Sequence, residues 1–276
     1  MSATDIHPTA VVDPRAEIDS DVEIGPYAVI DGPVRIGAGT KVWPHAYLSA
    51  PLEIGERVQI HIGAILGHLH QALREPQAGG VKIGPRTIIR EYATVHRASR
   101  EGGWTTIGSD CLLMGFSHVA HDCAIGSRVI LANGALMAGH VTIEDRAILS
   151  GNVAVHQFVR VGTLAMVAGL ARVNKDVPPY CLVKGDSEVW AVNAVGLKRA
   201  GLSEQARNKI REAYRLLYRS GLNTTQALKA IQAMEDVPPE VEHLVRFVQD
   251  SRRGICRHHI RMPEESLLDE EGEDVV

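Results

Sequence analysis

The stretch IGPYAVIDGPVRIGAGTKV, residues 24–42, carries an aliphatic residue at every sixth position. The fifth residue of each six-residue unit is small or β-branched, as at Ala28, Val34 and Thr40. A period of six matches neither the 3.6 of a helix nor the 2.0 of a strand. A short strand followed by a tight turn in every unit explains it, and three such units close one triangular coil.

The same period extends outward from this stretch. It runs from Ile6 to Leu66, returns from Ile83 to Val95, and continues from Ile107 to Val173. Coils of this kind stack at the ordinary strand spacing, and a six-residue repeat is the signature of a parallel β-helix. We therefore predict an all-β parallel β-helix over residues 1–185.

Two segments interrupt the repeat, and we expect loops at 67–82 and 101–106. Loops on a rigid scaffold are frequent places for function. From Ser203 the pattern becomes helical, with Ser203 as N-cap and Gly221 as the stop of one helix and two helical segments after it. This predicts a C-terminal helical domain over 186–262. Residues 263–276 are acidic and poor in apolar residues, so we expect a disordered tail.

The composition excludes several classes of protein. The chain is 45% hydrophobic and 22% charged with a net charge of −4, which argues against a nucleic-acid partner. No apolar run approaches the ~18 residues of a membrane span. The four cysteines form no CxxC pair, which indicates reduced thiols in a cytoplasmic protein.

The period also places histidines in columns. Units that begin at Val119, Met137 and Val155 are each three repeats apart and should stack, and they carry His121, His140 and His156. By the same count the break at 101 lies one coil below Val119. His118 closes the unit before Val119, and His96 lies one coil beneath that unit. Five histidines should therefore gather along one edge of the prism.

Three kinds of chemistry fit such an edge. The imidazoles could bind zinc, supply a general base, or hold an anionic ligand such as a diphosphate. The chain has no GxSxG elbow, no P-loop and no HExxH motif. Cys111 and Cys123 occupy the small corner position of the repeat, so we interpret them as packing residues and not as nucleophiles.

Longer motifs narrow the choice. The segments HVAHDC, ILANGALMAGHVTIEDRAILSG, AVHQFVRVG, DVPPY, VNAVGLKRAGLS and AYRLLYRSG resemble the UDP-N-acetylglucosamine O-acyltransferases of lipid A biosynthesis. The resemblance extends from about Ile6 to Gly254. It implies left-handed β-helices that form homotrimers and need no cofactor or metal. It also implies transfer of a (R)-3-hydroxyacyl chain from acyl carrier protein to the sugar 3-hydroxyl.

The resemblance assigns roles to individual residues. His121 is the expected general base, Asp122 supports it, and the N–H of Gly139 receives the oxyanion. A glycine at Gly169 leaves room for a long acyl chain. The expected substrate-binding residues are Gln71, Arg74, His96, His118, His140, His156, Gln157, Asn193 and Arg199.

The chain departs from the family pattern at Ala72, Val195 and Ala200, where the family tends to have an acidic residue, a glutamate and a second arginine. These changes leave the acceptor open between the 3-hydroxyl sugar and a 3-amino UDP-sugar, which would make the chain an N-acyltransferase. A zinc carbonic anhydrase and a non-catalytic hexapeptide protein are the alternatives of other classes. The H-x4-H spacing of those anhydrases is absent from the predicted prism.

Overall fold

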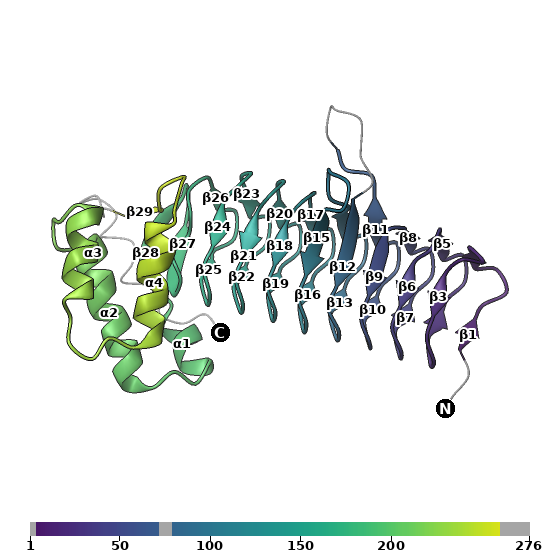
Figure 1. Ribbon diagram of the computed structural model, residues 1–276, viewed down its shortest axis with the longest axis horizontal. Helices are drawn as coiled ribbons and strands as arrows, with labels where there is room; N and C mark the ends of the chain where they lie inside the picture. Colours follow the sequence, from purple (N-terminus) through teal and green to yellow (C-terminus); the bar gives the residue numbers. More distant parts are fainter. Residues whose placement is uncertain (1–3, 72–78, 260–276) are drawn as a thin grey trace, which may run out of the picture.

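The computed structural model describes residues 4–71 and 79–259. It shows a left-handed parallel β-helix in the form of a long three-sided prism, with helices packed at its C-terminal end (Figure 1). Three sheets form the sides and contain 12, 9 and 8 strands, and their strands are parallel except where β28 (Glu188–Val192) pairs with β27 (Cys181–Lys184). The predicted fold class is confirmed.

Each coil contributes one strand to each sheet. Sheet 1 contains β1 (Asp5–Ile6), β4 (Glu23–Ile24), β7 (Lys41–Val42), β10 (Gln59–Ile60), β13 (Ile88–Ile89), β16 (Leu112–Leu113), β19 (Ile130–Leu131), β22 (Ile148–Leu149), β25 (Met166–Val167), β27 (Cys181–Lys184), β28 (Glu188–Val192) and β29 (Arg257–His258). Sheet 2 contains β2 (Val11–Val12), β5 (Val29–Asp31), β8 (Tyr47–Ser49), β11 (Ile65–His68), β14 (Thr94–His96), β17 (His118–Val119), β20 (Leu136–Met137), β23 (Ala154–Val155) and β26 (Arg172–Val173). Sheet 3 contains β3 (Glu17–Ile18), β6 (Arg35–Ile36), β9 (Leu52–Ile54), β12 (Gly80–Ile83), β15 (Trp104–Ile107), β18 (Ala124–Ile125), β21 (Thr142–Ile143) and β24 (Arg160–Val161).

The chain turns at three corners in every coil. We call the turns from sheet 1 to sheet 2 the first corner, from sheet 2 to sheet 3 the second, and from sheet 3 to sheet 1 the third. Many of these turns contain a residue with positive φ, such as His140 (φ 61) at the second corner and Arg146 (φ 59) at the third. The aliphatic residues point inward and are almost fully buried, as at Leu131, Met137 and Ile143.

The interruptions differ from the predicted bounds: the first lies between β11 and β12, at 69–79, and the second lies between β14 and β15, at 97–103. Strand β15 starts at Trp104, so residues 104–106 belong to a strand and not to a loop. The coil at this level is longer than a regular three-unit coil by one repeat unit, because Val95 pairs with Val119 and Ile83 pairs with Ile107. The prediction that residue 101 lies beneath Val119 is therefore wrong. The prediction that His96 lies beneath the unit ending in His118 is wrong too, because Thr94 pairs with His118. The extra unit leaves the coil and the chain returns in phase.

The sheet continues past residue 185. Strand β28 pairs antiparallel with β27, and β29 pairs with β28, so sheet 1 extends to Val192 before the helices begin. The helices are α1 (Ala194–Arg199), α2 (Glu204–Tyr218), α3 (Thr224–Gln232) and α4 (Pro239–Gln249). The Ser203 side chain caps α2 by accepting from the Ala206 N–H, as predicted. The acidic tail from 263 lies outside the described residues.

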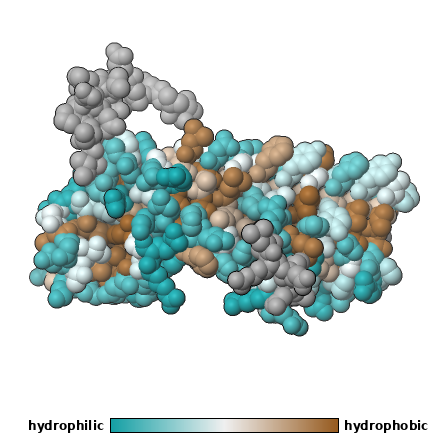
Figure 2. Space-filling model, turned by 90° about the horizontal axis from the view of Figure 1, so that it is seen from above, coloured by the Kyte–Doolittle hydropathy of each residue, from teal (hydrophilic) through white to brown (hydrophobic). Residues whose placement is uncertain are grey.

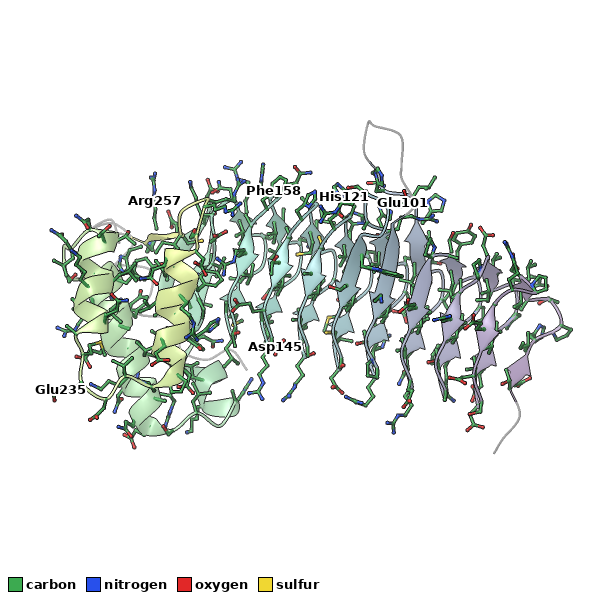
Figure 3. All side chains as sticks on the ribbon, in the orientation of Figure 1. Glu101, His121, Asp145, Phe158, Glu235 and Arg257 are labelled. Atoms are coloured by element: carbon green, nitrogen blue, oxygen red, sulfur yellow. The ribbon has the colours of Figure 1, made fainter. Side chains whose placement is uncertain are left out.

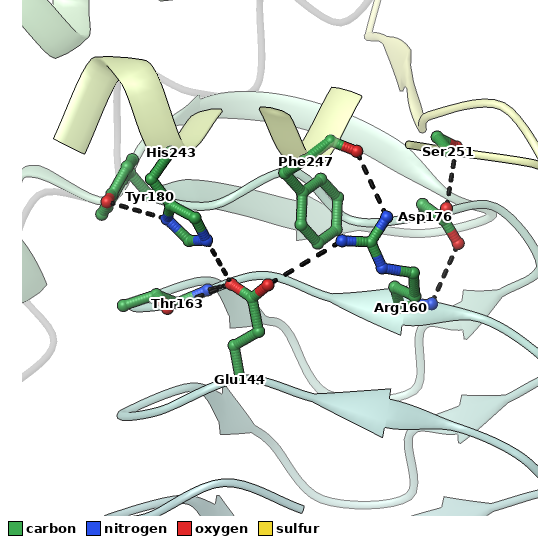
Figure 4. A network of polar contacts seen from close by, with 8 residues as sticks. All are labelled: Glu144, Arg160, Thr163, Asp176, Tyr180, His243, Phe247 and Ser251. Carbon is green, nitrogen blue, oxygen red and sulfur yellow. Dashed lines mark hydrogen bonds and ion pairs between the residues drawn. The ribbon is translucent and has the colours of Figure 1, made fainter. Parts of the chain in front are cut away.

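A polar network fastens α4 to the prism (Figure 4). Glu144 pairs with His243 at 3.0 Å, and His243 is also hydrogen bonded to the Tyr180 hydroxyl at 3.2 Å. The Arg160 guanidinium lies over the Phe247 ring, 4.1 Å from its centroid. The helical part is thus held on the last coils by both stacking and charge. Within the described ranges, no helix is long and apolar enough to cross a bilayer.

Candidate active site

His121 and Asp122 lie in the second-corner turn that follows β17, on the upper edge of the prism in Figure 3. The Nδ1 of His121 is 2.7 Å from the Oδ2 of Asp122. A carboxylate accepts hydrogen bonds, so Nδ1 carries the proton and Nε2 is left as the acceptor. The two side chains are 15% and 7% exposed, which leaves the pair reachable and largely sheltered from water.

Asp122 is held from three directions. Its Oδ2 accepts from the Ser99 hydroxyl at 2.6 Å and from the Ser99 N–H at 3.2 Å, and its own N–H donates to the Thr105 hydroxyl at 2.9 Å. Burial by itself raises the pKa of this carboxyl, but the hydrogen bonds from Ser99 and His121 outweigh burial and lower it. Asp122 is therefore ionised and fixed in place at neutral pH.

Gly139 and His140 lie one coil further along the same edge. A Cβ on Gly139 would lie 2.6 Å from both Cε1 and Nε2 of His121, so only a glycine fits against this ring. The ring of His140 is 5.1 Å from that of His121 and stacks on Phe158 at 4.6 Å. Burial lowers the pKa of His140, although Asp122 acts in the opposite direction.

Three further imidazoles lie on the other side of His121. His96 is 4.9 Å from His118, whose Nδ1 is hydrogen bonded to the Thr94 hydroxyl at 2.7 Å. Burial lowers the pKa of His118, and burial together with His118 lowers that of His96 to about 4. His70 is 5.4 Å from His121, and burial lowers its pKa as well. These imidazoles are neutral at physiological pH, when they can both donate and accept hydrogen bonds.

His121, Asp122 and His140 also meet the geometric condition for a metal ion, because their ligand atoms lie within 4.8 Å of one another. Two of these three residues are already hydrogen bonded to each other, through Nδ1 of His121 and Oδ2 of Asp122. A proton and a divalent cation would therefore compete for this group of three.

Other predicted residues lie apart from His121. His156 and Gln157 are one coil beyond Gly139, where His156 contacts the Arg253 guanidinium at 3.3 Å. Gln71 is exposed, and Arg74 and Ala72 lie outside the described residues. Gly169 is at the first corner, with only the carbonyl oxygen of Gly151 near its Cβ direction, at 3.4 Å.

Asn193 and Arg199 lie at the third corner, on α1 and its N-cap. The edge that carries the third corner is opposite to that of His121, as the label of Asp145 in Figure 3 shows. A cavity of about 750 Å³ opens here. Its lining consists of Arg128, Ile130, Arg146, Ile148, Leu164, Met166, Asn193, Val195, Gly196, Arg199 and Ala200. Within one copy of the chain, these residues therefore lie on a different edge of the prism from His121.

The sequence analysis missed Ser99, Thr105, His70 and Phe158. Ser99 and Thr105 lie in or beside the interruption at 101–106. The interruption itself was the sequence signal for these residues, because the six-residue period continues in the same phase after it. His70 lies in the other interruption, where both of its ring nitrogens lack a hydrogen-bond partner among the described residues. Phe158 occupies a turn position, where the repeat pattern carries no signal for an aromatic ring.

Comparison with known proteins shows the family to which this chain is related. A family model described as UDP-N-acetylglucosamine O-acyltransferase, domain 2, matches residues 176–256, and a bacterial transferase hexapeptide model matches 15–50 and 105–139. A curated relative named acyl-[acyl-carrier-protein]--UDP-N-acetylglucosamine O-acyltransferase, from Myxococcus xanthus, is 46% identical over 255 residues. That match covers 91% of this chain and 99% of the relative. The chain belongs to the UDP-N-acetylglucosamine O-acyltransferase family.

Further matches support this membership. A relative of the same name from Anaeromyxobacter sp. (strain Fw109-5) is 44% identical over 91% of this chain and 99% of its own length. The solved structure of the UDP-N-acetylglucosamine acyltransferase of Francisella novicida superposes with a TM-score of 0.88 at 38% identity. It covers 98% of this chain and 100% of that one. The family therefore accounts for both the prism and the helices.

Proposed function

We propose that the chain transfers a (R)-3-hydroxyacyl group from acyl carrier protein to the 3-hydroxyl of UDP-N-acetylglucosamine, the first step of lipid A biosynthesis. The observation that carries this proposal is the arrangement of His121. Its Nδ1 is bonded to Asp122 at 2.7 Å, and its Nε2 lies against the backbone of Gly139. A base with a fixed tautomer beside a backbone donor is what acyl transfer to a hydroxyl requires.

Each group has a definite task in the reaction. Nε2 of His121 takes the proton of the sugar hydroxyl as its oxygen attacks the thioester carbon. The N–H of Gly139 donates to no other atom in the described part of the chain, and it receives the oxyanion of the tetrahedral intermediate. The carbon–sulfur bond then breaks, and the imidazolium returns its proton to the leaving thiolate. Asp122 stabilises the imidazolium throughout.

Exposed apolar side chains support a homotrimer. Eight of the thirteen largely exposed hydrophobic residues in the described ranges lie on sheet 2 or at the first corner, including Phe116 (65% exposed) and Leu170 (80%). The eight are Val11, Tyr27, Ile62, Ile65, Tyr92, Phe116, Leu136 and Leu170. Figure 2 shows apolar patches along the prism. A surface of this kind marks a protein interface.

The trimer would complete the site. If the first corner faces a three-fold axis, sheet 2 of one copy packs against sheet 1 of the next copy. The second corner, with His121, then lies beside the third corner of its neighbour, with Asn193 and Arg199. We propose that the sugar nucleotide binds between these two corners. His96, His118, His140, His156 and Gln157 would line the same space from the first copy, and we propose Gln71 and Arg74 as further substrate-binding residues.

The cellular setting follows from the donor. Acyl carrier protein is a cytoplasmic partner of fatty acid chemistry, and we place the chain in the cytoplasm with it. Cys111, Cys123, Cys181 and Cys256 are all free and buried, as expected where thiols stay reduced.

The test is a transferase assay with purified protein, (R)-3-hydroxyacyl carrier proteins of several lengths, and UDP-sugars with a 3-hydroxyl or a 3-amino group. We expect mass spectrometry to show an O-acyl product, and activity confined to the 3-amino sugar would assign N-acyl transfer. His121→Ala should lose at least ~10²-fold in turnover, the usual value of a positioned general base. An active, stable monomer in sedimentation would contradict the trimer.

A further inference from the structure

We propose that Arg128 and Arg146 bind the diphosphate of the UDP-sugar acceptor in the third-corner cavity. This inference rests on the proposed function and assigns two binding residues that it does not include. The position of the two arginines in the cavity and the charge of the cavity lining support the inference.

The two arginines lie directly above one another. Arg128 follows β18 and Arg146 follows β21, at the same turn position in successive coils, and both have left-handed backbone (φ 57 and 59). The strands that precede them pair in register, Ile125 with Ile143. The guanidinium groups therefore start from backbone positions about 4.8 Å apart. A diphosphate has charged oxygens on both phosphorus atoms, so each phosphate can accept hydrogen bonds from one guanidinium.

The cavity that both side chains line is positively charged. Arg199 lines it from α1, and no lining residue is acidic. In the described ranges, no side chain forms a hydrogen bond or ion pair with the guanidinium of Arg128, Arg146 or Arg199. The nearest candidate for Arg128 is Asp110, which is already paired with Arg86 through two short bonds of 2.6 and 2.7 Å. Arginines that converge without carboxylate partners are suited to a phosphate ligand.

The remaining lining explains why a nucleotide fits better than a free anion. Ile130, Ile148 and Met166 form an apolar side beside the arginines, and such a surface accepts the flat pyrimidine ring. Asn193 is occupied within the protein, because its Nδ2 donates to the Leu164 carbonyl at 2.8 Å and its Oδ1 accepts from the Gly196 N–H at 3.0 Å. Asn193 therefore orients α1, and the charged contacts fall to the arginines.

Ala200 and Val195 line the same cavity. Neither side chain can pair with a phosphate, so α1 offers a single guanidinium to the cavity, that of Arg199. A diphosphate carries more charge than one arginine neutralises. Arg128 and Arg146 add two more guanidinium groups from the wall of the prism.

The experiment measures the KM for UDP-N-acetylglucosamine and the KM for the acyl carrier protein in Arg128→Ala, Arg146→Ala and the double variant. Loss of one charged phosphate contact should raise the KM for the sugar nucleotide by about tenfold, and loss of both by more than ~30-fold. The KM for the carrier should stay within about twofold. Arg57→Ala is the matched control, since Arg57 has the same turn position at the third corner (φ 54) and does not line the cavity.

Calorimetry with UDP and UMP on the free protein separates this inference from the proposed function. The double variant should lose affinity for UDP far more than for UMP. If wild-type protein binds UDP and the double variant does not, the arginine assignment holds even when no transferase activity is found. If turnover is normal and the double variant keeps the wild-type KM and UDP affinity, the assignment is wrong and the proposed function stands. A rise confined to the KM of the carrier would overturn it too, by assigning the arginines to the acidic donor protein.

Discussion

Gly139 lies directly against the ring of His121, so closely that a Cβ on Gly139 would be 2.6 Å from Nε2, the atom proposed as the base. The two residues come from successive coils, and the His140 N–H donates to the His121 carbonyl at 3.0 Å between them. The repeat therefore sets the distance between the base and the proposed oxyanion donor. This distance is fixed by the strand spacing and does not depend on a flexible loop.

Gly139→Ala should reduce turnover by about 10²-fold, since an added methyl group displaces the imidazole from its productive position. The φ of Gly139 lies outside the left-handed region, so the fold should tolerate alanine. Gly151→Ala is the control, because its Cβ would meet only the Asn133 carbonyl oxygen at 3.5 Å. The kcat values and circular dichroism spectra of both variants test whether alanine at position 139 lowers turnover while the fold is retained. Equal activity of the two would disprove the close contact.

Ser99→Ala should lower kcat by about tenfold, the value of one hydrogen bond to a charged group. The Ser99 hydroxyl is 2.6 Å from Asp122 Oδ2 and helps to lower the pKa of that carboxyl. Without the hydroxyl this pKa rises, so the acidic limb of the pH profile of kcat should move to higher pH. Ser99→Thr retains a hydroxyl and should restore both. A loss of kcat with an unmoved acidic limb would contradict a positioning role for Ser99.

His70→Leu should raise the KM for the sugar nucleotide by about tenfold, if the unpartnered ring nitrogens bind acceptor hydroxyls. His70 is 8% exposed and lies beside His121. Replacing an unsatisfied buried polar group with an apolar side chain is neutral or stabilising, so the melting temperature should hold or rise. Kinetics and thermal denaturation together test this. A lower melting temperature with an unchanged KM would indicate a structural histidine.

Acid should weaken the attachment of α4 to the prism. Burial raises the pKa of Glu144, but His243 and Thr163 outweigh burial, and the folded-state value is below the ordinary one. A depressed pKa contributes stability above the unfolded-state value of about 4.3, and that contribution is lost as pH falls through the folded-state value. Melting temperatures of wild type and Glu144→Gln should therefore converge as the pH falls below ~4. A constant difference at every pH would exclude Glu144 as the titrating group. Glu17→Gln, from an exposed pair with Arg35, is the control.

Gly169→Met should shorten the preferred acyl chain without abolishing catalysis. The Cβ direction at Gly169 meets only the Gly151 carbonyl oxygen at 3.4 Å, so the new side chain can enter the space beside the first corner. Each methylene that loses apolar contact costs about 0.8 kcal/mol, and two would shift preference by roughly tenfold. Competition between long and short 3-hydroxyacyl carrier proteins measures this ratio. An unaltered ratio would show that the acyl chain runs elsewhere.

The sequence by itself determined the prism, because burial of one aliphatic residue in every six leaves a chain few other ways to fold. The same period placed His121 and His140 in one column, and their strands pair as that count required, Val119 with Met137. It also located the start of α2, since Ser203 is a strong N-cap.

Only the tertiary structure decided what surrounds these residues. An extra repeat unit keeps the period in phase in either of two arrangements: it can add a side to the coil, or it can loop out of the coil. The pairing of β12 with β15 shows that it loops out. That excursion brings Ser99 to Asp122, although the two residues are far apart in the sequence. Likewise, Arg128, Arg146 and Arg199 line one cavity because α1 lies beside the third corner. Periodicity reports which face a residue occupies, but contacts between a repeat and the segments that leave it depend on packing, which has no period.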